Sequence, residues 1–261
     1  MAQRLLIRCH HKTKDENETT DLQDPDCRHR PLLAAPALAA PVLFAALPWD
    51  SNSDAENMSA VFGATGFTNY TNYKLAATDA NSIFSAANRF VMLEGGADTD
   101  AALAGYLGQY GAIIDAWVQG GGALLIQSAG WYNNISFKDV NLTMNASGCG
   151  TLTAAGAAAF TTAVSQCGGS LAHDLISGSG LTTYMTGSAG GAIVAGKEFG
   201  KGYIMYSGLT TSNFHSSGPS LSQSVIRYTA AQAGEVPEPA SIALLAAGIA
   251  AIGAMRRRSA R

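Results

Sequence analysis

The chain has 261 residues, of which 47% are hydrophobic and only 13% are charged, and its formal net charge is −3 at pH 7. The hydrophobic content is ample for a packed core, but the charged content is about half of the roughly 25% that is usual in soluble proteins. Residues 50–235 carry 12 acidic and 6 basic side chains. This composition favours a secreted or cell-surface protein, and the acidic balance argues against a nucleic-acid partner, which requires clustered positive charge.

Residues 1–50 are interpreted as a polar extension followed by a signal peptide. Arg28-His29-Arg30 precedes an apolar run, Pro31–Pro48, and a basic segment before an apolar one is the pattern of a secretory signal. We expect export by the Sec machinery and cleavage near Ala45–Ser51, with the polar extension explained by a gene model that starts too far upstream. The alternative is a disordered polar tail before a Pro/Ala-rich linker.

Residues 51–233 are predicted to form one α/β domain, and its clearest part is a strand, a helix and a strand. Arg89–Glu94 and Ala123–Gln127 are short apolar runs of the kind expected for buried strands. Between them, apolar residues recur at helical spacing and Gly120-Gly121-Gly122 ends the helix. The members of this stripe are Leu103, Tyr106, Leu107, Tyr110, Ile113, Ile114, Trp117 and Val118. Such a unit predicts parallel strands with a right-handed crossover.

The remaining elements are predicted from weaker patterns. Ala60–Gly63 is expected to be a short first strand and Ala77–Ala87 a helix. Thr153–Val164 is rich in Ala and expected to be helical. Ala192–Phe199 and Tyr203–Ser207 flank Gly200-Lys201-Gly202, which predicts an antiparallel hairpin, and Ser220–Gln232 is expected to be the closing helix.

Three segments of this domain resemble the class I glutamine-amidotransferase-like fold. They are Phe90–Gly96, Trp117–Ile126 and Gly200–Gly208. The resemblance implies a single flavodoxin-like, doubly wound α/β domain with a mostly parallel sheet and a late antiparallel hairpin. A working amidotransferase would have a Cys between glycines after a strand, but the turn here reads Ser128-Ala129-Gly130, so the resemblance implies a domain without that nucleophile.

Four polar side chains are the candidates for catalysis, although a catalytic set is the minority interpretation. Glu94 and Ser128 end two predicted strands, and His173 and His215 are the only histidines of the predicted domain. Together they could line one crevice at the carboxyl edge of the sheet, where sites gather in this class of fold. We expect no cofactor and no metal site, because helix capping explains Asp98 and Asp100 more simply than Ca²⁺ binding.

Cys149 and Cys167 are the only cysteines that remain after removal of residues 1–50. In an oxidising compartment two cysteines 18 positions apart are more often a disulfide than a nucleophile or a pair of metal ligands. A disulfide between Cys149 and Cys167 is therefore predicted.

Residues 234–261 have the layout of a C-terminal sorting signal. Val236-Pro237-Glu238-Pro239 is followed by the uncharged run Ala240–Met255 and then by Arg256, Arg257 and Arg258. This three-part pattern resembles the PEP-CTERM sorting signal. Sixteen helical residues span about 24 Å, and snorkelling arginines can extend this reach toward a 30 Å hydrocarbon core. The positive-inside rule leaves the Pro-Glu-Pro motif on the outer side.

The resemblance implies a transmembrane helix in the precursor, an exosortase as the processing partner, and a Gram-negative host that makes exopolysaccharide. The sequence therefore favours an exported surface or matrix protein with a non-catalytic binding or structural domain, and exopolysaccharide is its candidate partner. Two alternatives are an extracytoplasmic hydrolase that uses the strand-end crevice and a permanent membrane protein that keeps Ala240–Met255 as a generic anchor.

Overall fold

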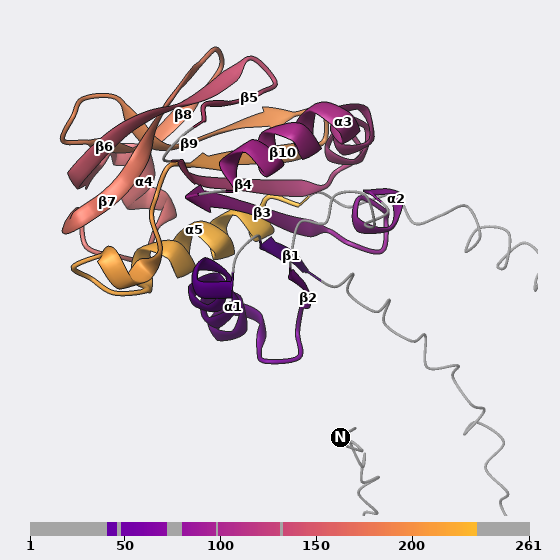
Figure 1. The fold of residues 1–261 in the computed structure, drawn as a ribbon, viewed down its shortest axis with the longest axis horizontal. Coiled ribbons are helices and arrows are strands. Elements are labelled where there is room, and N and C mark those ends of the chain that lie inside the picture. Colours follow the sequence, from indigo (N-terminus) through magenta and orange to yellow (C-terminus); the bar gives the residue numbers. More distant parts are fainter. Residues whose placement is uncertain (1–40, 46–47, 72–79, 98, 131–132, 234–261) are drawn as a thin grey trace, which may run out of the picture. The chain divides into compact units, whose positions relative to one another are not determined.

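The computed structural model describes residues 41–45, 48–71, 80–97, 99–130 and 133–233, which belong to one compact unit (Figure 1). The elements in chain order are β1 (Val42–Ala45), α1 (Pro48–Phe62), β2 (Thr68–Thr71), α2 (Ala80–Ile83), β3 (Phe90–Ala97), α3 (Asp100–Gln119), β4 (Ala123–Gly130), β5 (Ile135–Phe137), β6 (Val140–Leu152), α4 (Ala154–Ala159), β7 (Ser165–Gly178), β8 (Thr182–Gly187), β9 (Ala192–Phe199), β10 (Gly202–Ser207), the 3₁₀ helix η1 (Ser212–Phe214) and α5 (Ser220–Ala231).

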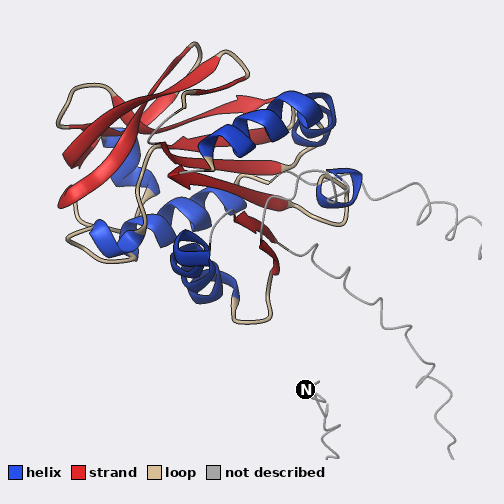
Figure 2. Ribbon diagram, in the orientation of Figure 1, coloured by secondary structure: helices blue, strands red, loops and turns tan. Residues whose placement is uncertain are grey.

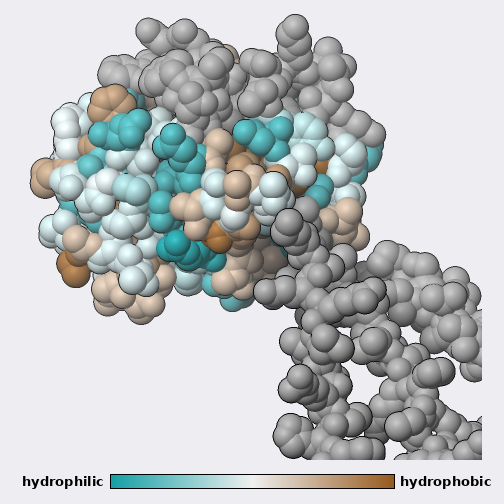
Figure 3. Space-filling model, turned by 90° about the horizontal axis from the view of Figure 1, so that it is seen from below, coloured by the Kyte–Doolittle hydropathy of each residue, from teal (hydrophilic) through white to brown (hydrophobic). Residues whose placement is uncertain are grey.

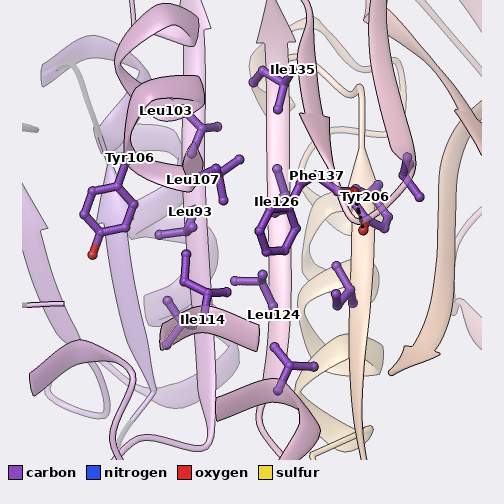
Figure 4. Close-up of a cluster of buried hydrophobic side chains, with 14 of the residues drawn as sticks. Leu93, Leu103, Tyr106, Leu107, Ile114, Leu124, Ile126, Ile135, Phe137 and Tyr206 are labelled. Atoms are coloured by element: carbon purple, nitrogen blue, oxygen red, sulfur yellow. Dashed lines mark hydrogen bonds between the residues drawn. The ribbon is translucent and has the colours of Figure 1, made fainter. Parts of the chain in front are cut away.

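One half of the sheet is parallel, in the order β2-β1-β3-β4-β10. The predicted strand–helix–strand unit is confirmed as β3-α3-β4, with Phe90 opposite Ala123 and Glu94 opposite Gln127. The central strands are apolar without alternation because helices cover both faces, α2 and α3 on one and α1 and α5 on the other (Figures 1 and 2). Figure 4 shows side chains of α3 packed against this sheet.

The other half is antiparallel, in the order β10-β9-β7-β6-β5. β8 pairs with both β6 and β9, so β6, β7, β9 and β8 close into a small barrel. β5 and β6 are joined at Lys138 and Asp139, whose positive φ values of 51° and 58° suit a type I′ turn. The predicted late hairpin is confirmed as β9 and β10, with Gly200 at φ 65° in its turn.

The prediction of a flavodoxin-like, mostly parallel sheet is therefore wrong, and the amidotransferase-like resemblance is not supported. Most of the strand pairings are antiparallel, because β5–β8 form from a stretch that sequence analysis left without strands. α4 is the only helix within the predicted Thr153–Val164 helix, and it spans six residues. Ala60–Gly63 is not a strand, because α1 runs through to Phe62. α2 and α5 lie where helices were predicted.

The described residues include only a small part of the two predicted targeting segments. The predicted sorting signal, with the transmembrane helix Ala240–Met255, lies outside the described residues. In the part of the chain that is described, no helix is long and apolar enough to cross a membrane. The predicted signal peptide lies outside it up to residue 40, whereas Val42–Ala45 form β1 within the sheet.

Candidate functional site

Polar side chains gather where β3 and β4 end, at the carboxyl edge of the parallel half. Glu94 lies opposite Gln127, and Gly95 lies opposite Ser128. Glu94 and Gln127 are each 4% exposed and Ser128 is fully buried. The strands thus place two predicted site residues, Glu94 and Ser128, on neighbouring positions of one edge, as expected from the parallel register.

Ser128 contacts a residue that sequence analysis did not select, Asp174 of β7. The Ser128 hydroxyl lies beside the Asp174 carboxyl group, and the backbone N–H of Gly130 donates to Asp174 Oδ2 at 3.1 Å. Gly130 leaves room for this approach, since a Cβ there would lie 3.2 Å from Asp174 Oδ2. Burial raises the pKa of Asp174 to about 6, against the opposing effect of the two hydrogen bonds, and the charge of Asp100 adds to the increase.

Asp100 braces the loop that follows β4. It is fully buried at the first position of α3, and its two carboxylate oxygens accept from the backbone N–H and the side-chain amide of Asn133 at 2.7 and 2.8 Å. Asp100 Oδ1 also accepts from the backbone N–H of Ala101. The N-cap of α3 is Thr99 and not Asp100, and the contacts with Asn133 instead fix the β4–β5 loop.

A second polar group ties α1 to the same edge. Gln127 Nε2 donates to Asp54 at 3.3 and 3.4 Å, and Ser53 is hydrogen-bonded to Ser212 of η1 at 2.9 Å. Asn57 donates to the same Ser212 hydroxyl at 3.3 Å. Ser53, Asp54 and Asn57 are all at least 96% buried. Sequence analysis missed these residues, although their spacing of one, three and four positions along a helix was a usable signal of a shared face.

His173 lies on β7, and His215 follows η1. Burial lowers the pKa of His173, and a backbone group of Ala129 opposes this shift. The backbone groups of Thr210 and Leu171 lie beside His215, yet burial lowers the pKa of this residue to about 4. Both residues are 6% exposed, and burial disfavours the charged form of each.

The arrangement offers a buried serine beside a carboxyl group whose pKa is near 6, in place of a serine beside an imidazole. A carboxylate with that pKa could accept a proton near neutral pH. Nucleophilic activation of Ser128 would however require access, and both Ser128 and Asp174 have no exposed surface. The geometry is that of a polar network that braces α1, α3, β4 and β7 at the carboxyl edge.

The opposite, amino edge carries a hollow. It has a volume of about 690 Å³ and lies among Phe62, Arg89, Phe90, Pro41 and Ala233, with further lining from residues 65–68 and 230–231. Arg89 Nη2 donates to the backbone oxygen of Ala233 at 3.2 Å. Both ends of the described domain thus lie at this edge, and the chain leaves it at Ala233.

The predicted disulfide is present between Cys149 and Cys167, which lie directly opposite each other on β6 and β7. Two loops attach beside it: the hydroxyl of Ser188 accepts from the N–H of Cys149, and that of Ser216 accepts from the N–H of Cys167. Among the described residues, no group of three or more His, Cys, Asp or Glu side chains could hold a metal ion.

Solved structures with a related arrangement are distant. A β-galactosidase from Bacillus circulans sp. alkalophilus is 11% identical with a TM-score of 0.45, over 74% of this chain and 30% of that one. An exo-β-1,4-mannosidase from Opitutaceae bacterium strain TAV5 is 15% identical with a TM-score of 0.40, over 74% and 36%. The carbohydrate deacetylase Agd3 is 10% identical with a TM-score of 0.38, over 67% and 30%. This chain spans about a third of their length, and likenesses this distant carry no functional argument.

Comparison with curated proteins gives no match. A comparison with family models matches residues 235–258 to the PEP-CTERM protein-sorting motif. This match covers the residues from which the sorting signal was predicted, including Pro237, Glu238 and Pro239. The chain therefore carries the sorting motif of exported, exosortase-processed proteins, which implies a membrane-anchored precursor in a Gram-negative bacterium.

Proposed function

We propose that the mature protein is a cell-surface or extracellular-matrix module whose domain binds or organises material outside the cell without catalysing a reaction. The observation that carries this proposal is the position of the sorting motif. The described domain ends at Ala233, and the motif begins at residue 235. One folded domain is therefore the cargo that the sorting signal delivers.

The state of the carboxyl edge supports a binding or structural role. Ser128, Asp174 and Asp100 are fully buried, and the two carboxylates accept from the backbone N–H groups of Gly130 and Asn133. The disulfide supports a location outside the cytosol, because disulfide bonds persist in oxidising compartments. The proposal includes export by the Sec machinery and removal of the C-terminal segment close to Pro237-Glu238-Pro239.

We include exopolysaccharide as the material that the mature domain contacts. The face seen in Figure 3 mixes weakly polar residues with strongly hydrophilic ones and small hydrophobic patches, and only 13% of the chain is charged. Hydroxyl and amide groups on such a surface can exchange hydrogen bonds with sugar hydroxyls without a large electrostatic field.

Fractionation of the host with and without its exosortase tests the assignment. In the wild type we expect a mature protein that lacks the C-terminal segment and co-sediments with isolated exopolysaccharide. Without the exosortase we expect a longer, membrane-bound protein. A matched variant in which Arg256, Arg257 and Arg258 are replaced by Gln keeps the Pro-Glu-Pro motif. It tests the basic part of the sorting signal separately from that motif. A mature protein that stays free in the medium and does not sediment with polysaccharide would overturn the matrix role.

An extracytoplasmic hydrolase is the second candidate, and the Ser128–Asp174 pair is the observation that favours it. A fluorophosphonate probe, which labels activated serines, distinguishes the two functions. Labelling of the wild type that is lost in Ser128→Ala and retained in Ser136→Ala would establish a nucleophile. We expect no labelling of Ser128, because its hydroxyl is fully buried.

A further inference from the structure

The strand β1 is an integral part of the sheet. Val42 and Leu43 are at most 1% exposed, and β1 lies between β2 and β3, in register with both. The backbone oxygen of Pro41 accepts from the N–H of Thr68 at 2.9 Å, which extends the β1–β2 pairing by one more residue.

Cleavage in the range Ala45–Ser51 would remove this strand. β2 pairs with no other strand than β1 in the described sheet, so it would lose its attachment. β3 would become an exposed edge on one side, with a row of unpaired backbone groups that favours association with other chains. A signal peptide that is compatible with this fold has to end before Pro41.

The sequence offers a cleavage site immediately before that limit. Signal peptidases cut after small residues in an Ala-x-Ala-like pattern that follows the apolar segment. Ala37-Leu38-Ala39 has this pattern, as does Ala35-Pro36-Ala37, whereas residues 42–51 contain no such triplet. A cut after Ala39 leaves a longer apolar run in the signal peptide than a cut after Ala37. The longer run fits the length of the apolar segment of a signal peptide better.

We propose that a membrane-bound signal peptidase hydrolyses the peptide bond between Ala39 and Ala40, so that the mature domain begins at Ala40 and keeps β1. Water adds across the bond, and the products are a carboxylate at Ala39 and an ammonium group at Ala40. The proposal rests on the export proposed above. It also places both attachment points to the membrane, the signal peptide before Pro41 and the sorting signal after Ala233, at the amino edge of the sheet.

The test uses the full-length chain in a Gram-negative host, with N-terminal sequencing and intact-mass measurement of the protein from envelope and medium. We expect an N-terminus at Ala40. An N-terminus at Leu38, or anywhere from residue 46 to residue 52, would overturn the proposed bond and leave export intact. A full-length chain in the cytoplasm would instead overturn export itself, so the two failures are distinguishable.

Two matched substitutions sharpen the test, since neither lies in the described domain. Ala39→Tyr places a bulky side chain next to the proposed bond, and we expect loss of the mature form and an uncleaved precursor in the membrane. Ala35→Tyr should leave the Ala40 N-terminus unchanged, because it alters only the upstream triplet. Normal processing of Ala39→Tyr, or blocked processing of Ala35→Tyr, would contradict the assignment.

Discussion

The parallel and antiparallel halves of the sheet are stabilised in different ways. In β4 of the parallel half, seven of eight residues are buried, because helices cover both faces. In β6 of the antiparallel half, buried positions are separated by exposed ones, four of them in a row. The hydrophobic core extends through both halves, and the second half adds closed strand pairing and a disulfide. The difference shows that one sheet can combine two sources of stability.

The largest effect is expected from a cavity in the parallel half. Leu125 lies on β4, is fully buried and belongs to the core that β4 shares with α1 and α5. Leu125→Ala should lower the free energy of unfolding by about 3–5 kcal/mol, the transfer and cavity terms together. The control Thr143→Ala on β6 changes an exposed residue. It should change the free energy of unfolding by less than about 0.5 kcal/mol. Urea denaturation measures both, and similar losses would contradict the comparison.

Removal of the disulfide tests the antiparallel half. For a loop of this size, the bond should contribute about 3 kcal/mol, mainly by restricting the unfolded chain. We expect Cys149→Ser combined with Cys167→Ser, or addition of reductant, to cause that loss. Hydrogen exchange should then rise first in β6 and β7, while β3 and β4 stay protected. Equal loss of protection in both halves would show that the two are stabilised as one unit.

The polar edge between the halves should give opposing pH effects. The folded pKa of Asp174, about 6, is raised above the unfolded value of about 3.9, so the stability that this group contributes at low pH is lost as pH rises through 6. The folded pKa of His215, about 4, is depressed below about 6.5, so its contribution is lost as pH falls from 6.5 to 4. In the wild type the two effects largely cancel between pH 4 and 6.5.

Asp174→Asn should remove the contribution of Asp174 to the pH dependence of stability and leave that of His215 and His173. At pH 7 to 8 we expect a gain of about 2–3 kcal/mol over the wild type, since each pKa unit corresponds to about 1.4 kcal/mol. The advantage should vanish by pH 4, where stability falls because the two buried histidines, His215 and His173, become protonated. Asp139→Asn is the control, because Asp139 is exposed in the β5–β6 turn. Wild-type and Asp174→Asn stability curves that run parallel across this range would contradict the assignment of the buried carboxyl group.

How far the sequence predicted the fold follows the same division. Phe90–Leu93 and Ala123–Ile126 are continuous apolar runs, and the apolar residues from Leu103 to Val118 have helical spacing. The parallel unit β3-α3-β4 could therefore be predicted from the sequence. β6 could not be predicted in this way, because its alternation is interrupted by a register shift between Met144 and Ser147 and seven of its 13 residues are Asn, Ser, Thr or Gly. Such strands are specified by long-range pairing, which a local pattern does not contain.

The candidate site shows the same limit. Glu94 and Ser128 were predicted at the carboxyl edge because each ends an apolar run. Asp174 was not selected. Its contact with Ser128 depends on β7 reaching β4, a tertiary relationship between residues 46 positions apart in sequence. The buried partners from α1 depend likewise on how that helix packs. The sequence pattern therefore predicted that polar groups lie at the carboxyl edge of the parallel strands. The packing of distant elements determined which groups meet there.

The smallest effect is expected where the halves meet α5. The hydroxyl groups of Tyr203 and Tyr228 are hydrogen-bonded to that of Tyr184 at 2.7 and 2.9 Å, which links β10, α5 and β8. Burial raises the pKa of each of these phenols to about 12. Tyr228→Phe keeps the ring contacts with Tyr184 and Tyr203 but removes one hydrogen bond, and should lower the free energy of unfolding by about 1 kcal/mol. Tyr228→Ala would also remove the ring, with an expected loss of about 3 kcal/mol. If Phe and Ala cost the same, the hydroxyl network, and not the aromatic packing, would be what joins the two halves to α5.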